Sequence, residues 1–370
     1  MKIGVPKEIK PQEYRVGMSP AGVRQLVAHG HEVLVEAGAG VSSGYSDEAY
    51  VRAGAKIVPD GATAWNEADM VVKVKEPLPE EFAYFRPGLV LYTYLHLAAF
   101  PELTRALLEK GVRGVAYETI TDDDGGLPLL RPMSEIAGRM ATQVGAKCLE
   151  REIGGKGILL GGVPGTRRGR VVILGGGVVG TAAARIAIGM GAKVTVLDIN
   201  AARMAYLEDV FGNHIETLYS NPESIDEEVR RADLVIGAVL VPGAAAPKLV
   251  TEEHLREMED GSVVVDVAVD QGGSIATCHP TTHDAPTYVV EGIVHYCVAN
   301  MPGAVPQTST VALTNATIRY ALEIADEGLE QAIASNPHLA RGVNTFDGKL
   351  TCKPVAEAHG LEYTPLEAVR

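Results

Sequence analysis

The stretch RVVILGGGVVGTAAARIAIGMGAKVTVLD, residues 170–198, decides the fold. An apolar run, a cluster of glycines, an alanine-rich run and a second apolar run predict a strand, a turn, a helix and another strand. Gly175, Gly177 and Gly180 have the spacing G-x-G-x-x-G. That spacing supplies a tight turn, room for a pyrophosphate against the backbone, and close packing of helix on strand. The N-terminal end of the helix would bind the pyrophosphate through its N–H groups and its dipole.

Asp198 follows Gly180 at the distance expected of the carboxylate that binds a ribose. Such a carboxylate accepts hydrogen bonds from free 2′ and 3′ hydroxyls and repels a 2′-phosphate, so the pattern favours NAD over NADP. Arg203 is close in sequence and could weaken that preference. A glycine motif by itself is weak evidence, but here the strand, the helix and the acid agree, and we expect an NAD site.

The composition is that of an α/β protein with many tight turns. The chain has 370 residues, 46% hydrophobic and 22% charged, with 41 glycines and 5% aromatic residues, and is long enough for two domains. The net charge of −14 argues against nucleic acid or an anionic membrane as partner, although local Arg and Lys can still bind an anionic substrate. Residues 171–190 are apolar, but Arg185 and the glycines argue against a membrane span.

A cytoplasmic location is expected, because MKIGVPKE has no apolar run typical of a secretory signal. The cysteines lack metal-ligand spacing and are expected to be reduced thiols: Cys148, Cys278, Cys297 and Cys352. His279 and His283 are four residues apart, which suits a metal only on a helix. Pro280 lies between them in TCHPTTHDAP, so we favour a solvated loop and expect no metal site.

Strands alternate with helices along the chain, which indicates mainly parallel sheets with helices on both faces. Strands are predicted at residues 2–5, 31–36, 55–58, 69–75, 89–96, 114–118, 233–239, 262–267 and 294–298, besides those of the glycine unit. Helices are predicted from the Ser19 cap to Gly30, at 46–53 and 101–110, and as two long patterns at 133–151 and 309–334. No repeat or low-complexity tract is evident.

The order of these elements predicts two doubly wound α/β domains. A Rossmann dinucleotide-binding domain, residues 130–308, is expected as an insertion in a discontinuous Rossmann-like substrate domain made of residues 1–129 and 309–370. The two long helices would link the domains and form a hinge.

Ionisable residues recur at the predicted carboxyl ends of strands, where open α/β sheets bind ligands. In the first domain Arg15 follows the first strand, and Lys75, His96 and Glu118 end later strands. In the cofactor domain Asp270 follows the run SVVVDVAVD. All five could face one cleft.

These residue types suit the oxidation of a small 2-substituted acid. Arg15 would bind a carboxylate with its planar fork, Lys75 would contact a carboxylate or carbonyl oxygen, and His96 would shuttle a proton. Asp270 could hold an ammonium group or a water. Each residue also has a structural explanation: a loop salt bridge, a solvated strand end, a core histidine and a turn cap, in that order.

Two lysines and one glutamate leave a choice open. Lys73 has the same strand parity as Lys75, and Lys75 is favoured only because it is nearer the carboxyl end. Glu118 is expected to be structural, paired with a base or capping a loop.

The chain resembles the alanine dehydrogenase family essentially from end to end. The segments that carry the resemblance are KIGVPKE, EYRVGMSPAG, VVKVKEP, LYTYLHLAA, LPLLRPMSEIAGRMA, GGVPG, LGGGVVGTAAARIAIGMGAKVTVLDIN, ADLVIGAVLVPGAAAPKLV, VVVDVAVDQGG, VHYCVANMPGAVPQTST and LTNAT. The resemblance implies reversible, NAD-dependent deamination of L-alanine to pyruvate and ammonium. It implies catalysis by His96 and Asp270, substrate binding by Arg15 and Lys75, and a homohexamer.

The same resemblance implies a set of contacts to NAD. They are Ser134, Gly175, Gly177, Val178, Val179, Gly180, Asp198, Arg203, Ser220, Val239, Leu240, Val267, Ala268, Val269, Asp270, Val298, Ala299, Asn300 and Met301. Relatives often carry Lys where this chain has Arg203, which keeps the charge. At His279 relatives can carry an arginine that contacts the cofactor, so that contact stays open.

Three other functions remain to be distinguished. The NAD-binding subunit of proton-pumping transhydrogenase has the same two-domain plan, but the joint presence of His96, Asp270, Arg15 and Lys75 favours an enzyme with its own substrate. A dehydrogenase for a larger amino acid would need an extra pocket-forming insertion, which is not evident. A sensor that only binds NAD would leave the cleft residues unexplained.

Overall fold

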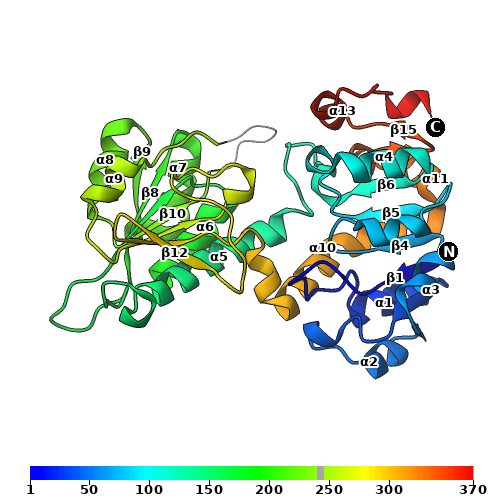
Figure 1. Ribbon diagram of the computed structural model, residues 1–370, viewed down its shortest axis with the longest axis horizontal. Helices are drawn as coiled ribbons and strands as arrows, with labels where there is room; N and C mark the ends of the chain where they lie inside the picture. The colour runs from blue at the N-terminus through cyan, green and yellow to red at the C-terminus, as the bar shows by residue number, and fades with distance from the viewer. Residues whose placement is uncertain (240–245, 370) are drawn as a thin grey trace. The chain divides into compact units, whose positions relative to one another are not determined.

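A computed structural model describes residues 1–239 and 246–369 (Figure 1). The chain forms two compact units. The first unit comprises Met1–Met133 and Val305–Arg370, and the second unit comprises Ser134–Ala304. One boundary falls inside helix α5 (Arg131–Cys148), and the other falls just before helix α10 (Pro306–Glu327).

The first unit is built on one mixed sheet with the strand order β15-β14-β6-β5-β4-β1-β2-β3. Pairing is parallel from β6 through β3, and β14 runs antiparallel to both of its neighbours. The strands are β1 (Lys2–Val5), β2 (Glu32–Glu36), β3 (Lys56–Val58), β4 (Met70–Val72), β5 (Val90–Thr93), β6 (Arg113–Ala116), β14 (Val343–Phe346) and β15 (Lys349–Leu350).

Helices of the first unit pack on this sheet or on one another. They are α1 (Pro20–Ala28), α2 (Asp47–Arg52), α3 (Gly61–Asn66), α4 (Pro101–Glu109), α10, α11 (Leu329–Ser335), α12 (Pro337–Arg341) and α13 (Lys353–His359). The predicted cap of the first helix is confirmed, because the Ser19 side chain accepts a hydrogen bond from the N–H of Gly22.

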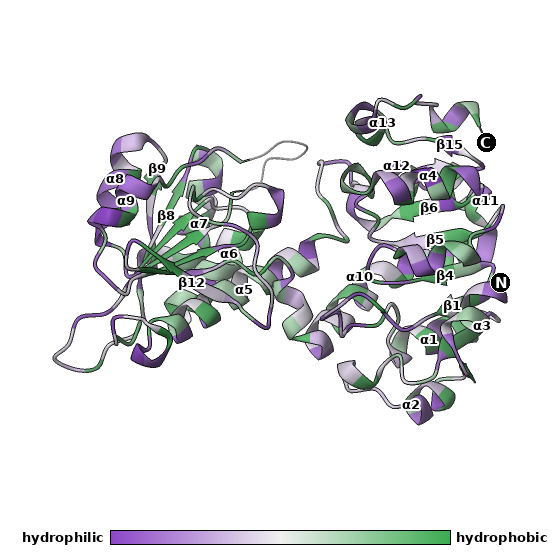
Figure 2. Cartoon of the chain, viewed as in Figure 1, coloured by the Kyte–Doolittle hydropathy of each residue, from purple (hydrophilic) through white to green (hydrophobic). Residues whose placement is uncertain are grey.

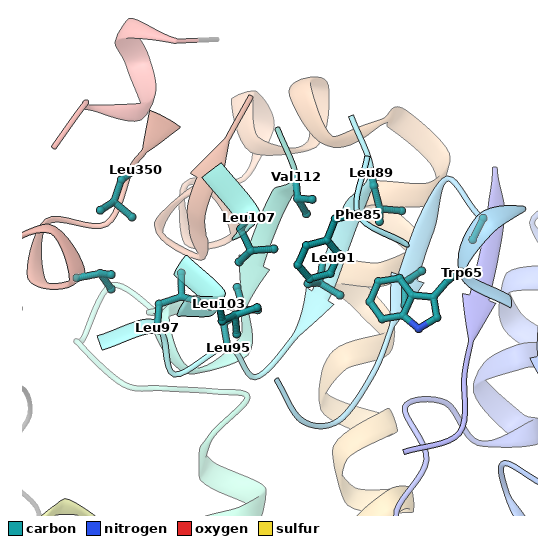
Figure 3. Packing of buried hydrophobic residues seen from close by; sticks show 14 of the residues in the cluster. Trp65, Phe85, Leu89, Leu91, Leu95, Leu97, Leu103, Leu107, Val112 and Leu350 are labelled. Carbon is teal, nitrogen blue, oxygen red and sulfur yellow. The ribbon is translucent and has the colours of Figure 1, made fainter. Parts of the chain in front are cut away.

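The core of the first unit includes a cluster of buried aliphatic and aromatic side chains. Figure 3 shows Trp65 from α3, Leu91 from β5, and Leu103 and Leu107 from α4 gathered with Leu350 from β15. Burial of these side chains holds the helices against the sheet. Figure 2 shows the same division of polarity, with mainly hydrophobic strands and helices that carry both colours.

The second unit has its own sheet with the strand order β12-β13-β11-β10-β7-β8-β9. All pairs are parallel except β12 with β13. The strands are β7 (Arg170–Leu174), β8 (Lys193–Asp198), β9 (Glu216–Tyr219), β10 (Leu234–Gly237), β11 (Val263–Asp266), β12 (Thr287–Val290) and β13 (Ile293–Tyr296). The helices besides α5 are α6 (Val178–Gly189), α7 (Ala201–Phe211), α8 (Pro222–Arg231) and α9 (Glu252–Glu257).

The predicted α/β class with mainly parallel sheets is confirmed. Several predicted strands are shorter than expected, because the ladders end before the ionisable residues: β4 ends at Val72, β5 at Thr93 and β6 at Ala116. In the described ranges, 1–239 and 246–369, no helix is both long and apolar enough to cross a membrane.

The prediction of one helix over residues 309–334 is wrong. Helix α10 ends at Glu327 and α11 begins at Leu329, with Gly328 between them at φ 79° and ψ 152°. That conformation is open essentially only to glycine, so the helical hydrophobic pattern continues across a backbone break. The pattern did not reveal the break because α11 resumes almost at once.

Replacing Gly328 with alanine should therefore destabilise the protein. A Cβ at this φ and ψ costs ~1–3 kcal/mol of strain, and Gly328→Ala should lower the free energy of unfolding by that amount. Chemical denaturation would measure the loss of unfolding free energy, and the m-value should stay unchanged. A variant as stable as the parent would mean that α10 can run on into α11.

Candidate functional site

The second unit has a topological switch point beside β7. From β7 the chain proceeds to β8 and β9 on one side, and then returns to β10, β11 and β13 on the other. Gly175, the first residue after β7, lies so close to the end of β10 that a Cβ on it would be 3.0 Å from the carbonyl oxygen of Ala238. Ligands of open α/β sheets bind at such a point, beyond the carboxyl ends of the strands.

Each glycine of the motif meets a different steric condition. Gly175 has φ +96°, which disfavours any side chain. A Cβ on Gly180 would lie 1.9 Å from the carbonyl oxygen of Gly175, so this position allows helix α6 to approach the turn. A Cβ on Gly177 would meet no atom within 4 Å. The open space at Gly177 is where the motif is expected to admit a pyrophosphate.

The start of α6 is also chemically suited to an anion. Its N-cap is Gly177, and no side chain caps it in the described part of the chain. The neighbouring helices α7, α8 and α9 are each capped by a side chain, from Asn200, Asn221 and Thr251 respectively. The first N–H groups of α6 therefore have no side-chain acceptor and can bind phosphate oxygens.

Asp198 and Arg203 hold the glycine turn from the side of β8. One carboxylate oxygen of Asp198 accepts from the N–H of Gly176 at 2.6 Å, and the other accepts from the N–H of Asn200 at 2.8 Å. Each oxygen retains further acceptor capacity for ribose hydroxyls. Arg203 donates to the carbonyl oxygens of Gly176 and Gly177, so its guanidinium is engaged by the turn itself.

The remaining predicted cofactor contacts follow the ends of strands in this same sheet, apart from Ser134 near the start of α5. Ser220 follows β9 and donates its N–H to the carbonyl oxygen of Asp198 at 2.9 Å. Val239 follows β10, and Leu240 lies outside the described residues. Val267, Ala268, Val269 and Asp270 follow β11, and Val298, Ala299, Asn300 and Met301 follow β13. Parallel pairing places these ends on one edge of the sheet.

A second aspartate, Asp266, fixes the turn that carries Asp270. The buried Asp266 carboxylate accepts from the N–H groups of Ala268 at 3.1 Å, Ser274 at 2.8 Å and Ile275 at 3.0 Å. Burial raises its pKa although these three donors act in the opposite direction. Asp270 itself is exposed. Sequence reasoning missed Asp266, although VVVDVAVD places an acid at the strand's last residue.

His279 is held by an aromatic neighbour. Its ring stacks on Tyr288 with a centroid distance of 4.0 Å, and its backbone N–H donates to the Tyr288 hydroxyl at 3.0 Å. His283 contacts the carbonyl oxygen of Asn300 at 2.8 Å. Among residues 1–239 and 246–369, no group of three or more His, Cys, Asp or Glu is arranged to hold a metal ion.

In the first unit, the strands β6, β5, β4 and β1 are adjacent and parallel. Arg15 lies in the loop after β1, and its side chain is only 2% exposed. Its Nε and Nη2 each donate to the Glu13 carboxylate at 2.6 Å, and its Nη1 lies 3.1 Å from the Met133 sulfur. Burial lowers the pKa of Arg15, but the adjacent Glu13 outweighs it and the net shift is upward.

Lys73 and Lys75 have different surroundings. The Lys73 ammonium is buried between two carboxylates, 2.8 Å from Glu81 and 3.3 Å from Glu8. Lys75 is partly buried, and its pKa is lowered by burial and by the nearby charge of Arg15. Lys73 is therefore part of a buried ion cluster, and Lys75 is the lysine that lies near Arg15.

His96 follows β5 in a left-handed conformation, with φ 48° and ψ 37°. Its backbone N–H donates to the Glu118 carboxylate at 2.6 Å, and the backbone N–H of Leu95 donates to the same group at 3.2 Å. The imidazole Nδ1 lies 3.9 Å from Glu118. Glu118 thus caps the loop that carries His96, which is one of the two structural roles expected for it.

Tyr94 connects His96 with Arg15, and sequence reasoning missed it. The Tyr94 ring lies parallel to the His96 ring at a centroid distance of 5.7 Å, and its hydroxyl donates to the carbonyl oxygen of Leu129 at 2.7 Å. Burial raises the pKa of Tyr94 while the charge of Arg15 lowers it, which places the two side chains near one another. The alternation in LYTYLHLAA, with Tyr94 two residues before His96, was the available signal.

These contacts bring together a guanidinium, an ammonium and an imidazole at the ends of adjacent strands. Arg15 and Lys75 supply positive charge for a small anion, and His96 supplies an imidazole that can accept or donate a proton. The arrangement suits an acid with a carbonyl or amino group beside its carboxylate.

Comparison with known proteins gives the family. The model of the alanine dehydrogenase/PNT N-terminal domain matches residues 4–137, and that of the C-terminal domain matches residues 141–353. The chain is 60% identical to the alanine dehydrogenase of Bacillus subtilis (strain 168) over 368 residues, 99% of this chain and 97% of that protein.

Two solved structures are similar over nearly the whole chain. An L-alanine dehydrogenase has a TM-score of 0.95 and 54% identity, covering 97% of this chain and 99% of that chain. A transhydrogenase from Sinorhizobium meliloti has a TM-score of 0.82 but 25% identity, covering 95% of this chain and 99% of that chain. The resemblance stated from the sequence is thereby confirmed, and the chain belongs to the alanine dehydrogenase/PNT family.

Proposed function

We propose that the protein catalyses L-alanine + NAD⁺ + H₂O ⇌ pyruvate + NH₄⁺ + NADH + H⁺. The observation that carries this proposal is the cluster of Arg15, Lys75 and His96 at adjacent strand ends, in a chain 60% identical to an alanine dehydrogenase over 99% of its length. The same identity supports an oxidoreductase that acts on the CH–NH₂ group of an amino acid.

Residues 130–308 are proposed to form the NAD-binding domain, and residues 1–129 with 309–370 the substrate domain. The glycine turn fits NAD: Gly177 borders open space, the start of α6 lacks a side-chain cap, and Asp198 has further acceptor capacity. When bound, NAD⁺ supplies a hydride acceptor for C2 of the substrate. The contacts to it are those named from the resemblance.

Arg15 is proposed to bind the substrate carboxylate. A guanidinium has two edges that can each make paired hydrogen bonds. Glu13 engages the edge formed by Nε and Nη2. Glu13 thereby orients the group, and Lys75 is proposed to contact the keto oxygen, or the carbonyl that develops from the amine carbon.

His96 is proposed as the group that moves protons. After hydride leaves C2, the imine carbon must add water, and the resulting carbinolamine must lose ammonia to give pyruvate. Both steps move a proton to or from oxygen or nitrogen, which an imidazole does well near neutral pH. Glu118 accepts a hydrogen bond from the backbone N–H of His96 at 2.6 Å and so fixes its position. Asp270 is proposed to assist the proton transfers from the cofactor domain.

A homohexamer and a cytoplasmic location complete the proposal. The hexamer follows only from the family resemblance. The location is supported by the four cysteines, Cys148, Cys278, Cys297 and Cys352, all of which are free thiols.

The requirement for substrates tests this function. NADH absorbance should fall only when pyruvate and ammonium are both present, and replacing NADH with NADPH should slow the reaction strongly. If pyruvate is inert and NADH is oxidised only with a hydride-accepting partner protein, the protein acts as a transhydrogenase subunit instead.

Substituting His96 tests its proton role. His96→Asn should lower kcat by ~10²-fold or more, because asparagine cannot transfer a proton in this pH range. Asparagine tolerates the left-handed backbone of this position, so the thermal midpoint should stay close to that of the parent. Near-parental turnover in a folded His96→Asn variant would exclude the assignment.

Substituting Asp198 tests the choice of cofactor. Asp198→Asn keeps an acceptor for the N–H of Gly176 but removes the charge that would repel a 2′-phosphate. Two unit charges about 4 Å apart repel by ~4 kcal/mol at an effective dielectric constant near ~20, so the preference for NADH over NADPH should fall at least ~10-fold. The ratio of kcat/KM values measures it, and an unchanged ratio would place Asp198 away from the ribose.

A further inference from the structure

The segment that carries Lys75 is held differently on its two sides. On the side of β5, Lys73 donates its N–H to the Tyr92 carbonyl oxygen at 3.2 Å, and Tyr94 donates its N–H to the Val74 carbonyl oxygen at 3.3 Å. On the side of β1, strand pairing stops at the pair of Gly4 with Val71. On this side, the chain therefore leaves the β1 ladder before it reaches Val74 and Lys75.

Glu8 supplies the missing acceptor. It follows β1, and one oxygen of its carboxylate accepts from the N–H of Val74 at 2.6 Å and from the N–H of Lys75 at 3.3 Å. A buried N–H must find a partner, and this side chain takes the place of carbonyl groups that β1 no longer provides. The backbone of Lys75 is thus fixed by a side chain from the neighbouring strand.

The second oxygen of Glu8 faces the buried lysine, Lys73, at 3.3 Å. Lys73 also contacts Glu81 at 2.8 Å, and all three side chains are at most 5% exposed. Burial raises the pKa of Glu8, and the Lys73 ammonium opposes that effect. Lys73 therefore helps to keep Glu8 in the ionised form, which is the stronger acceptor for two N–H groups.

We propose that Glu8 is a positioning residue for Lys75, which it places for contact with the substrate by holding the backbone of residues 74 and 75. The inference rests on the proposed role of Lys75. It assigns a function to a buried ion cluster that would otherwise be only structural, and it explains why Lys73 and Lys75, which share strand parity, differ in role.

Glu81 offers a matched control within the same cluster. It contacts Lys73 more closely than Glu8 does, and its other oxygen accepts from the N–H of Leu78 at 3.0 Å. Among the described contacts, Glu81 accepts no hydrogen bond from the backbone N–H of Val74 or Lys75. Glu8→Gln and Glu81→Gln each remove one negative charge beside the Lys73 ammonium. Only Glu8→Gln also changes the acceptor of the backbone N–H groups of Val74 and Lys75.

Kinetics of the two variants separate positioning from charge balance. Glu8→Gln should lower kcat/KM for pyruvate ~10-fold or more, since a displacement of about 1 Å can cost ~10²-fold, whereas Glu81→Gln should lose less than about 3-fold. Equal losses of kcat/KM in the two variants would overturn the proposal. Glu8→Asp, which keeps the charge but withdraws the acceptor, should resemble Glu8→Gln and serves as the test if the latter does not fold.

A double substitution tests whether Glu8 acts through Lys75. Once Lys75→Met has removed the ammonium, adding Glu8→Gln should change kcat/KM by no more than about 2-fold, the usual tolerance of additivity. If the Glu8→Gln loss persists in full in that background, Glu8 acts by another route.

A readout without turnover separates this inference from the proposed function. Competitive labelling with acetic anhydride, read by peptide mass spectrometry, reports the reactivity of the Lys75 amine. Because the Lys75 side chain is partly buried, releasing its segment should change its labelling in Glu8→Gln but not in Glu81→Gln. Unchanged labelling in Glu8→Gln overturns positioning, whereas an unmodified protein inert toward pyruvate overturns only the proposed function.

Discussion

Parallel strand pairing is the constraint on which the rest of the structure depends. In a parallel ladder every strand ends at the same edge of the sheet, so residues that are far apart in sequence meet at that edge. In the first unit this edge gathers the loops after β1, β4, β5 and β6. In the second unit it gathers the glycine turn and the segments after β8, β9, β10, β11 and β13. The two sets of candidate residues follow from this one geometry.

The same geometry creates a cost, which carboxylates offset. Where a strand leaves the ladder, its next N–H groups lose their partners and need acceptors. Glu8 serves residues 74 and 75, Glu118 serves His96, and Asp266 serves the turn that carries Asp270. Asp198 does the same for the glycine turn while keeping acceptor capacity for a ribose. Acids at strand ends therefore shape the loops as well as the chemistry of the site.

The sequence predicted what depends on local pattern. The glycine spacing with Asp198, the alternation of strands and helices, and the cationic residues at strand ends were all visible, because each depends on a period or a fixed spacing. The pairing of Arg15 with Glu13, the burial of Lys73 and the stacking of Tyr94 on His96 depend on which strands become neighbours or on how a loop folds back. Those facts appear only once β1, β4 and β5 are placed side by side.

Backbone conformation is the other feature that the sequence pattern did not predict. The left-handed φ of His96 and the break at Gly328 leave the hydrophobic period almost undisturbed, so periodicity could not report them. Glycine at a break is a usable signal, but glycines inside helical patterns are common enough that Gly328 did not stand out. His96 gave no signal of its own, because the Glu118 side chain that accepts from its backbone N–H comes from a different part of the chain.

The central claim is that this chain passes hydride between a nicotinamide and C2 of its own small substrate. The most direct test uses NADH deuterated at both C4 positions together with pyruvate and ammonium, followed by mass spectrometry of the product. The expected product is L-alanine with one deuterium at C2. Unlabelled alanine, or deuterium found only in a second nucleotide, would contradict it.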